Sequence, residues 1–341
     1  TVLSGRSNRE CLHGEFLKLS TNPFGDLFRL ERLFIWSCDF SNITNEAFKR
    51  LYNLQLLFIM KPKNISKNLT FTGLPALKWV ILEDYDLFQF DLSTSPSLLV
   101  MQSLSFSDQS KVYSSDVFSK LKHSNLKVLD IGTHTKFVHF DTNYLAGFTA
   151  LHTLKIRDAQ LKTITFSENL SNLQTLSLEA NELETLDSTI SLLKGLKSLD
   201  LSSNFYLKST PDMFRGLDSL ELLNLFGCNN LGEIYMNMFR GLPNLVELDL
   251  SWCDLTQIHP DAFSHIPKLT KLNLSCNNLK LENADVFRHL TQLKVLDLSS
   301  NKLQYLDIKQ GIFSNLVCLE LLNLQDNNID MDNIKQNKWF K

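Results

Sequence analysis

The chain has 341 residues, of which 43% are hydrophobic, and it carries a formal charge of −3. A nucleic-acid-binding face usually needs a surplus of basic residues, so this charge does not favour a nucleic acid as the partner. No apolar stretch approaches the roughly 18 residues that a membrane span requires, so a membrane anchor would need a span outside this chain.

The N-terminal part of the chain is irregular. Residues 1–29 precede any repeated pattern and are predicted to form a capping segment, to which Cys11 would belong. Six copies of an apolar pattern follow, beginning at Leu30, Leu54, Leu77, Met101, Leu126 and Leu151. The second to sixth copies lack the asparagine found in most later ones, and the copy at Met101 fits the pattern least well.

From Leu173 onward the pattern is regular. It is clearest in three copies between Leu245 and Leu303, which are spaced 24 residues apart. Each copy reads Leu-x-x-Leu-x-Leu-x-x-(Asn or Cys)-x-Leu, and the Leu-x-Leu alternation is typical of a short strand with one buried face. A single copy cannot cover its own leucines, so neighbouring copies must stack on one another.

This period predicts an α/β-type leucine-rich repeat solenoid. We expect a horseshoe with about 13 parallel strands on its concave face, and loops and short helical turns on its convex side. The repeats would cover residues 30–331 without a domain break, and residues 332–341 would start a further repeat or form a truncated tail.

Two further positions of the repeat have packing roles. The ninth position carries asparagine or cysteine, and a side-chain amide there can satisfy backbone groups that the turn buries. Cys38, Cys228 and Cys253 occupy this position. We expect buried thiols, although Cys228 and Cys253 would lie on adjacent rungs within backbone reach of a disulfide. The recurring phenylalanines, such as Phe263 and Phe287, are predicted to pack under the convex side.

Five Asn-x-Ser/Thr sequons favour a secretory route, and hence a place outside the cell, either on its membrane or secreted. They begin at Asn42, Asn64, Asn68, Asn169 and Asn273. The first four lie in predicted loops or irregular repeats, where we expect glycans. Asn273 is left open because it falls between two strand leucines, so a glycan there would block the concave face.

Catalytic and metal-binding motifs are absent from the sequence. There is no Gly-x-Gly-x-x-Gly, Walker loop, His-Glu-x-x-His or Gly-x-Ser-x-Gly, so we expect no enzyme activity, cofactor or metal. His259 lies next but one to Asp261, but no nucleophile occurs at a matching spacing. A solvated loop histidine is therefore the preferred interpretation.

The concave face offers a candidate binding site in the first three repeats. Residues that flank the strand leucines point outward, because strand side chains alternate. In these repeats the rule selects large apolar side chains: Phe34, Trp36, Leu56, Phe58, Met60, Trp79 and Ile81. Such a patch is typical of a binding surface. Two alternatives remain open: residues 1–29 could cover it, or a register slip of one residue could place it in the core.

The regular repeats give a different concave surface. Their outward positions are small or polar: Ser177, Asp200, Ser202, Asp249, Ser251, Asp297 and Ser299. Acidic residues also recur near the outward strand positions: Glu83, Asp84, Asp86, Glu179, Glu182, Glu247, Asp249 and Asp254. They could steer a basic ligand, but an ordinary solvated face is the preferred interpretation.

The combination resembles the extracellular domain of Toll and Toll-like receptors. The resemblance rests on the repeat with its convex Phe-x-x-Leu, on the sequons, and on Leu322 to Ile329 followed by Trp339. It implies an innate-immune receptor ectodomain that binds a protein or microbial-type ligand and signals by pairing with a second receptor chain, identical or different. A secreted structural or matrix-binding repeat protein is the alternative.

Overall fold

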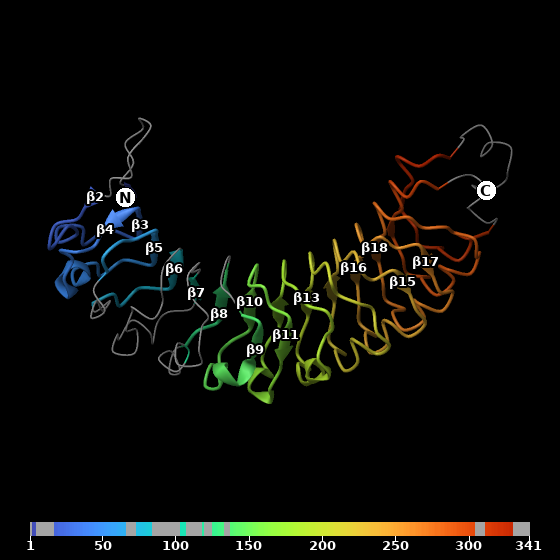
Figure 1. The fold of residues 1–341 in the computed structure, drawn as a ribbon, viewed down its shortest axis with the longest axis horizontal. Helices are drawn as coiled ribbons and strands as arrows, with labels where there is room; N and C mark the ends of the chain where they lie inside the picture. The colour runs from blue at the N-terminus through green and yellow to red at the C-terminus, as the bar shows by residue number, and fades with distance from the viewer. Residues whose placement is uncertain are drawn as a thin grey trace. The chain divides into compact units, whose positions relative to one another are not determined.

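The structure is a computed structural model that describes residues 2–4, 17–65, 73–83, 103–106, 118, 125–132, 137–303 and 311–329. Its contacts group the chain into two compact units. Unit 1 comprises Thr1–Phe137 with Asp141–Gln160, and unit 2 comprises Val138–Phe140 with Leu161–Lys341. Figure 1 shows the strands following one another in chain order within each unit.

The described residues of unit 1 form seven long-sheet strands in the order in which they occur along the chain. They are β1 (Val2–Ser4), β3 (Arg32–Trp36), β5 (Leu56–Met60), β6 (Trp79–Glu83), β7 (Ser103–Phe106), β8 (Val128–Ile131) and β10 (Thr153–Ile156). Each strand pairs in parallel with the next, and the register aligns equivalent positions of successive repeats.

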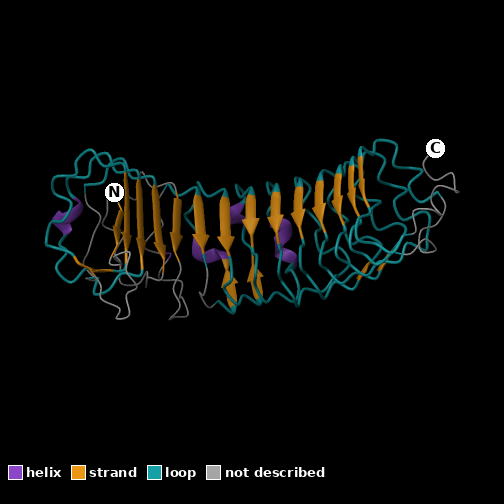
Figure 2. Ribbon diagram, turned by 90° about the horizontal axis from the view of Figure 1, so that it is seen from above, coloured by secondary structure: helices purple, strands orange, loops and turns teal. Residues whose placement is uncertain are grey.

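Unit 2 has the same construction with seven shorter strands. They are β12 (Thr175–Ser177), β13 (Ser198–Asp200), β14 (Leu222–Asn224), β16 (Glu247–Asp249), β18 (Lys271–Asn273), β19 (Val295–Asp297) and β20 (Leu321–Asn323). All pairings between them are parallel and in register. Figure 2 shows the strands of each unit side by side, with their arrows pointing the same way.

Small elements lie on the other side of the coils. Short strands form three pairs: β2 (Leu17–Lys18) with β4 (Cys38–Asp39), β9 (His139–Asp141) with β11 (Thr163–Thr165), and β15 (Glu233–Ile234) with β17 (Gln257–Ile258). The described helices are short 3-10 turns: η1 (Asn45–Phe48), η4 (Thr142–Leu145), η5 (Glu168–Leu170) and η6 (Ser188–Leu192). None of the described helices is long and apolar enough to cross a membrane.

The core of each unit is a ladder of repeated apolar side chains. From β12 to β19, the two leucines of each Leu-x-Leu, such as Leu248 and Leu250, are at most 2% exposed because their side chains point into the coil. Phenylalanines fill the opposite side of the core in unit 2. Phe214, Phe239, Phe263, Phe287 and Phe313 form a continuous stack with ring centroids 6.0–6.3 Å apart. The predicted packing role of the phenylalanines is confirmed.

Asparagine at the ninth position ties neighbouring coils together. The amide nitrogen of Asn277 donates to the carbonyl oxygens of Leu250, in the preceding coil, and Leu274, in its own coil. Its Oδ1 accepts hydrogen bonds from the backbone N–H groups of Cys253 and Leu255. Asn204 and Asn301 make equivalent bonds. A polar side chain is stable inside this core because it satisfies backbone groups that the turn buries.

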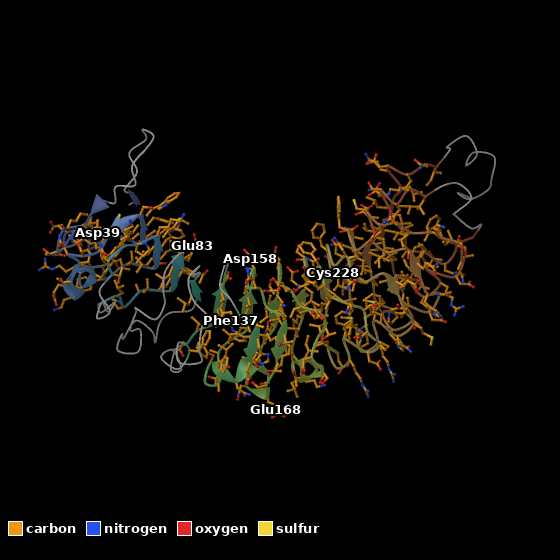
Figure 3. The ribbon with its side chains drawn as sticks, in the orientation of Figure 1. Asp39, Glu83, Phe137, Asp158, Glu168 and Cys228 are labelled. Carbon is orange, nitrogen blue, oxygen red and sulfur yellow. The ribbon has the colours of Figure 1, made fainter. Side chains whose placement is uncertain are left out.

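Cysteine replaces asparagine on two adjacent coils of unit 2. Cys228 and Cys253 are buried free thiols, as predicted, and Figure 3 shows the position of Cys228. Their Sγ atoms donate to the carbonyl oxygens of Leu201 and Leu225, at 3.2 and 3.0 Å. Burial raises the pKa of the Cys228 thiol to about 12, and burial also raises the pKa of Cys253. Each thiol thus keeps the donor function of the amide but presents only a weak acceptor.

The predicted fold class is confirmed: both units are coils of a leucine-rich repeat solenoid built on parallel strands. All long-sheet strands except β1 lie in predicted repeats, including β7 in the doubtful repeat at Met101. The predicted domain limits, with a cap over residues 1–29 and a tail over 332–341, stay predictions. Cys11, Asn68, Asp84, Asp86 and Trp339 lie outside the described residues.

One expectation for the regular repeats needs correction. Ser177, Ser202 and Ser251 were expected to point outward to solvent, but they are only 3–6% exposed. The reason is a local turn in which Ser251 donates both its N–H and its hydroxyl group to Oδ1 of Asp249. Ser202 does the same with Asp200. Ser202 and Ser251 are therefore held against the sheet instead of facing a ligand, whereas Ser177 is a strand residue aligned with Asp200 and forms no such turn with any described residue.

Candidate ligand-binding face

The large apolar side chains predicted for the first three repeats lie together on one face of unit 1. In both units, one face of the long sheet carries the side chains that do not enter the core. We call it the open face. Along β3, β5 and β6, buried residues alternate with exposed or half-buried ones. The predicted site residues occupy the exposed or half-buried positions: Phe34, Trp36, Leu56, Phe58, Met60, Trp79 and Ile81. We call this set the apolar patch.

Strand register brings the patch residues into adjacent columns. Phe34 is aligned with Phe58, and Phe58 with Ile81, across the three strands. The Phe34 and Phe58 ring centroids are 5.7 Å apart, within the range of favourable aromatic pairs. Trp36 and Trp79 stand at opposite corners, each 41% exposed. The patch is therefore a continuous apolar surface whose two tryptophans are exposed to water.

Two borders of the patch are basic or polar. The ammonium group of Lys78 lies 5.8 Å from the ring centroid of Trp79, in cation–π geometry. Ser105 follows Ile81 in its column on β7, so the apolar column ends there. On the other side, β1 pairs alongside β3 and thereby extends the sheet. The described part of the N-terminal segment thus lies beside the patch at the level of the backbone.

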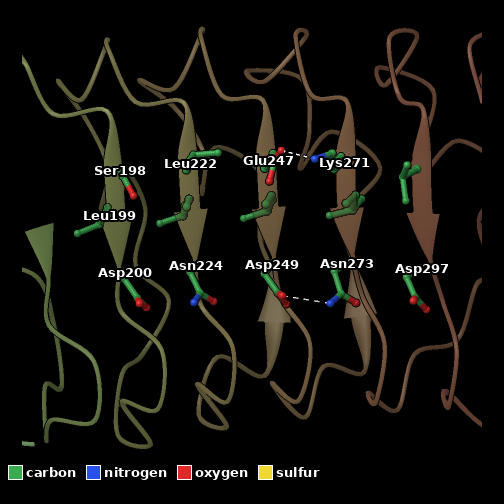
Figure 4. A pocket seen from close by; sticks show the side chains of 14 residues that line it. Ser198, Leu199, Asp200, Leu222, Asn224, Glu247, Asp249, Lys271, Asn273 and Asp297 are labelled. Atoms are coloured by element: carbon green, nitrogen blue, oxygen red, sulfur yellow. Dashed lines mark hydrogen bonds and ion pairs between the residues drawn. The ribbon is translucent and has the colours of Figure 1, made fainter. Parts of the chain in front are cut away.

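The open face of unit 2 has a different chemistry. One column alternates carboxylate and amide from strand to strand: Asp200, Asn224, Asp249, Asn273, Asp297 and Asn323. The amide nitrogens of Asn273 and Asn323 donate to Oδ2 of the preceding aspartate, at 3.1 and 3.0 Å. All of this column except Asn323 lines a hollow of about 470 Å³, shown in Figure 4 together with the Glu247–Lys271 ion pair.

Unit 2 also exposes large apolar side chains that the sequence interpretation overlooked. Leu222 and Phe226 are 42% and 41% exposed, and Trp252 on the next coil is 58% exposed. The alternation rule that selected Phe34 and Phe58 would also have selected Phe226, which follows a core leucine. Trp252 had a second signal, because the other regular repeats have small or polar residues at its position.

The sequons differ in accessibility. Asn42, Asn64 and Asn169 are exposed, and Figure 3 places Glu168, the neighbour of Asn169, on the side of the coil away from the long sheet. Asn273 is half-buried, and its side chain bonds to Asp249, Ser251 and Ser275. Whether any of the five is glycosylated stays a prediction.

Several of the other acidic candidates are engaged in local contacts, and Nδ1 of His259 accepts a hydrogen bond from the N–H of Asp261. Glu247 pairs with Lys271, and Asp254 accepts a hydrogen bond from Asn278. Asp261 accepts its hydrogen bonds from His289 and Arg288, which together lower its pKa. In the part of the chain that the structure describes, no three His, Cys, Asp or Glu side chains are grouped so as to hold a metal ion.

A family comparison agrees with the observed coils. In five overlapping segments, residues 171–329 match the family model described as leucine rich repeat. These segments contain all seven described long-sheet strands of unit 2. Residues 171–329 therefore carry leucine-rich repeats, and the fold of both units is that of a leucine-rich repeat solenoid.

Curated relatives share part of the chain. The chain is 36% identical over 109 residues to the leucine-rich repeat-containing G-protein coupled receptor 5 of Rattus norvegicus. The matched residues make up 31% of this chain and 12% of the receptor. It is also 36% identical over 119 residues to Tsukushi of Xenopus tropicalis, covering 34% of this chain and 33% of Tsukushi. The matched segments therefore span well under two thirds of these relatives.

Solved structures with a similar fold include Toll-type receptors. The structure of the Drosophila Toll–Spatzle complex has a TM-score of 0.64 at 20% identity, covering 90% of this chain and 45% of that chain. The TLR13–ssRNA13 complex has a TM-score of 0.57 at 19% identity, covering 96% and 66%. At these identities the similarity shows the fold alone.

Proposed function

We propose that the chain is the ligand-recognition part of an extracellular receptor of the Toll-like type, and that its ligand docks on the apolar patch of unit 1. The observation that carries the proposal is the aromatic surface formed by the exposed Trp36 and Trp79 and the half-buried Phe34 and Phe58 on adjacent strands. Water disfavours such a surface, and aromatic anchors are where interface energy concentrates.

Two further observations support this assignment. The fold is similar to that of receptor chains solved with their ligands, namely Toll with Spatzle and TLR13 with RNA. The exposed sequons at Asn42 and Asn169 suit a glycoprotein on the outer side of a cell membrane or in the secretory route. In this proposal the ligand is a protein or a microbial-type molecule, and binding leads to pairing with another receptor chain.

A secreted repeat protein is the second candidate. The sequence identity of this chain to Tsukushi equals its identity to the rat receptor, and Tsukushi is not named as a receptor. We therefore keep this candidate. The continuing reading frame separates the two candidates. A cysteine-rich cap, one apolar span and a cytoplasmic domain would support the receptor, whereas a stop codon or a coiled coil would support the secreted protein.

The binding face is tested by placing a charge in the patch. Phe58→Lys and Trp79→Lys should leave secretion and the melting temperature unchanged, because both side chains lie outside the core. Binding to a panel of secreted proteins and microbial extracts, measured on immobilised protein, should be lost in both variants. Val317→Lys is the matched control, since Val317 is 78% exposed and lies in the other unit.

Two results would contradict this proposal. If Phe58→Lys is not secreted while Val317→Lys is, the patch is part of the core and the binding assignment fails. If a ligand of the unmodified chain also binds Phe58→Lys and Trp79→Lys with unchanged affinity, the ligand docks elsewhere.

A further inference from the structure

Trp252 has an unusual backbone conformation for a residue of its size. Its φ is +56°, in the left-handed region, where bulky residues are rare. Every regular coil of unit 2 has a left-handed residue at this position, and the others are small or short and polar: Ala180, Ser203, Gly227, Cys276, Ser300 and Asp326. A large aromatic residue is thus held in a strained conformation while 58% of it faces solvent. Backbone preference does not explain this choice, and such outliers concentrate at functional sites.

The neighbouring coil contributes a second exposed aromatic ring. Phe226 and Leu222 flank Asn224 along the β14 coil, and strand alternation places all three on the open face. The N–H of Gly227 donates to the carbonyl oxygen of Ser251, which places Phe226 and Trp252 on adjacent coils at nearly the same height. Phe226 and Trp252 therefore lie on adjacent coils just beyond the ends of β14 and β16, whose strand residues line the hollow.

The carboxylates beside these rings have no cation as a partner. Register places Asp200 and Asp249 on the strands either side of Asn224, diagonally across from Phe226. Among the described residues, neither aspartate takes part in an ion pair, whereas Glu221 and Glu247 are paired with Lys197 and Lys271. The surface is therefore apolar at its centre and negative at its flanks.

The pair Asp200 and Asn224 is also open to a ligand. In the next two carboxylate–amide pairs along the column, the amide donates to Oδ2 of the aspartate. Within the described residues, Oδ2 of Asp200 and the amide nitrogen of Asn224 take part in no hydrogen bond, although Oδ1 of each is held by a residue of its own turn. One free acceptor and one free donor thus lie side by side at the hollow.

We propose that this surface docks a partner protein through an arginine side chain. The guanidinium group would stack on Phe226 and Trp252 and bond to Asp200 and Asp249, while Asn224 donates to a backbone carbonyl of the partner. Arginine fits better than lysine because its planar group stacks on aromatic rings and binds carboxylates through two N–H groups. The absence of a compensating cation makes the surface complementary to a basic partner. This site lies in unit 2 and is separate from the apolar patch.

The test uses the full chain and short synthetic peptides. One fluorescein-labelled glycine–serine peptide carries two arginines, and matched peptides carry lysine or citrulline, which has a similar shape to arginine but no charge. Anisotropy should rank them arginine, lysine, then citrulline. In protein labelled with 15N-tryptophan, the arginine peptide should shift one of the four indole N–H signals, the one absent from Trp252→Phe.

Three variants preserve the fold while removing parts of the site. Trp252→Ser introduces the residue that Ser203 and Ser300 provide at the same position, so it should fold at least as well. Asp249→Asn and Asp200→Asn introduce the amide already present on alternate strands. Each should weaken the arginine peptide roughly threefold to tenfold. Asp218→Asn removes an exposed carboxylate of the same unit away from the site and should have no effect.

The outcomes separate the alternatives. Binding of the citrulline peptide as tight as that of the arginine peptide would overturn the proposal in favour of a shape effect. An equal loss of affinity for the arginine peptide in Asp218→Asn and Asp249→Asn would overturn it in favour of a net-charge effect. An unmoved Trp252 indole signal would show that the peptide binds elsewhere. If a neutral oligosaccharide shifts that signal and the arginine peptide does not, the surface is a glycan site and the proposal is wrong.

Discussion

The side-chain amide of Asn277 donates a hydrogen bond to the carbonyl oxygen of Leu250, 2.8 Å away in the preceding coil. The same side chain accepts hydrogen bonds from the backbone N–H groups of Cys253 and Leu255. One buried residue thereby satisfies backbone groups in two coils, and its removal would leave several of them without partners.

Asn277→Ala should lower the free energy of unfolding by about 3 kcal/mol, since each buried group left unsatisfied costs about 1–3 kcal/mol. Asn277→Cys should cost roughly half as much, because the thiols at Cys228 and Cys253 still donate to the preceding coil. Urea unfolding followed by circular dichroism measures both. Equal losses in the two variants would mean that the acceptor bonds contribute little.

Asn273 should remain without a glycan when the chain is secreted from eukaryotic cells. Its amide nitrogen, the atom to which a glycan is attached, donates to Asp249 and Ser251, and the side chain is only half exposed. Asn42 and Asn169 should be occupied because their side chains are exposed. Peptide mass spectrometry after enzymatic deglycosylation in heavy-oxygen water reports the occupancy of each site. Full occupancy of Asn273 would require this part of the open face to rearrange.

Protonation of Asp187 should lower the free energy of unfolding in acid. Its carboxylate caps η6 by accepting hydrogen bonds from the hydroxyl and N–H groups of Thr189, and these bonds lower its pKa. A lowered folded pKa means that the stabilisation is present above the ordinary value of 3.8 and is lost as pH falls through the folded pKa. Asp187→Ala should cost about 1 kcal/mol at pH 7.

The difference between the unmodified chain and Asp187→Ala should shrink as pH falls below the ordinary carboxyl range. Chemical denaturation at pH 7, 4 and 3 measures it. Asp218→Ala provides the control, because Asp218 is exposed and caps none of the described helices. A difference that stays constant down to pH 3 would show that Asp187 acts only through packing.

The buried thiols should be inert in the folded protein. Burial raises the pKa of Cys228 to about 12, so almost no reactive thiolate exists at pH 8. Cys276 and Cys318 are half-buried and should react with N-ethylmaleimide first. Peptide mapping after timed alkylation measures each rate. Labelling of Cys228 and Cys253 as fast as that of Cys276 would contradict their burial.

The sequence predicted the strands well because one physical pattern determines them. Alternating leucines at a fixed period can be buried only by stacking, so Leu248, Leu272 and Leu296 occupy equivalent positions. The same alternation placed Phe58 and Trp79 on the open face without further information. Where burial alone decides on which face of a strand a side chain lies, the sequence pattern is sufficient to predict that face.

Other features depend on geometry that the apolar pattern does not encode. Ser251 is buried because it folds back on Asp249, a contact two residues away that polarity alone would not suggest. The left-handed backbone of Trp252 depends on the turn that ends each strand. β1 pairs with β3 although Val2–Ser4 carries no repeat signature. The site in unit 2 rests on such features, so it emerged only from the structure.

The phenylalanine stack also governs how strongly unit 2 bends. Its ring centroids are 6.0–6.3 Å apart, while paired strands lie about 4.8 Å apart. Adjacent coils are therefore farther apart at the stack than at the sheet, which makes the solenoid of unit 2 curve. Replacing these rings with smaller side chains would flatten the arc. The curvature of the open face of unit 2 is thus set by side chains on the opposite side of the core.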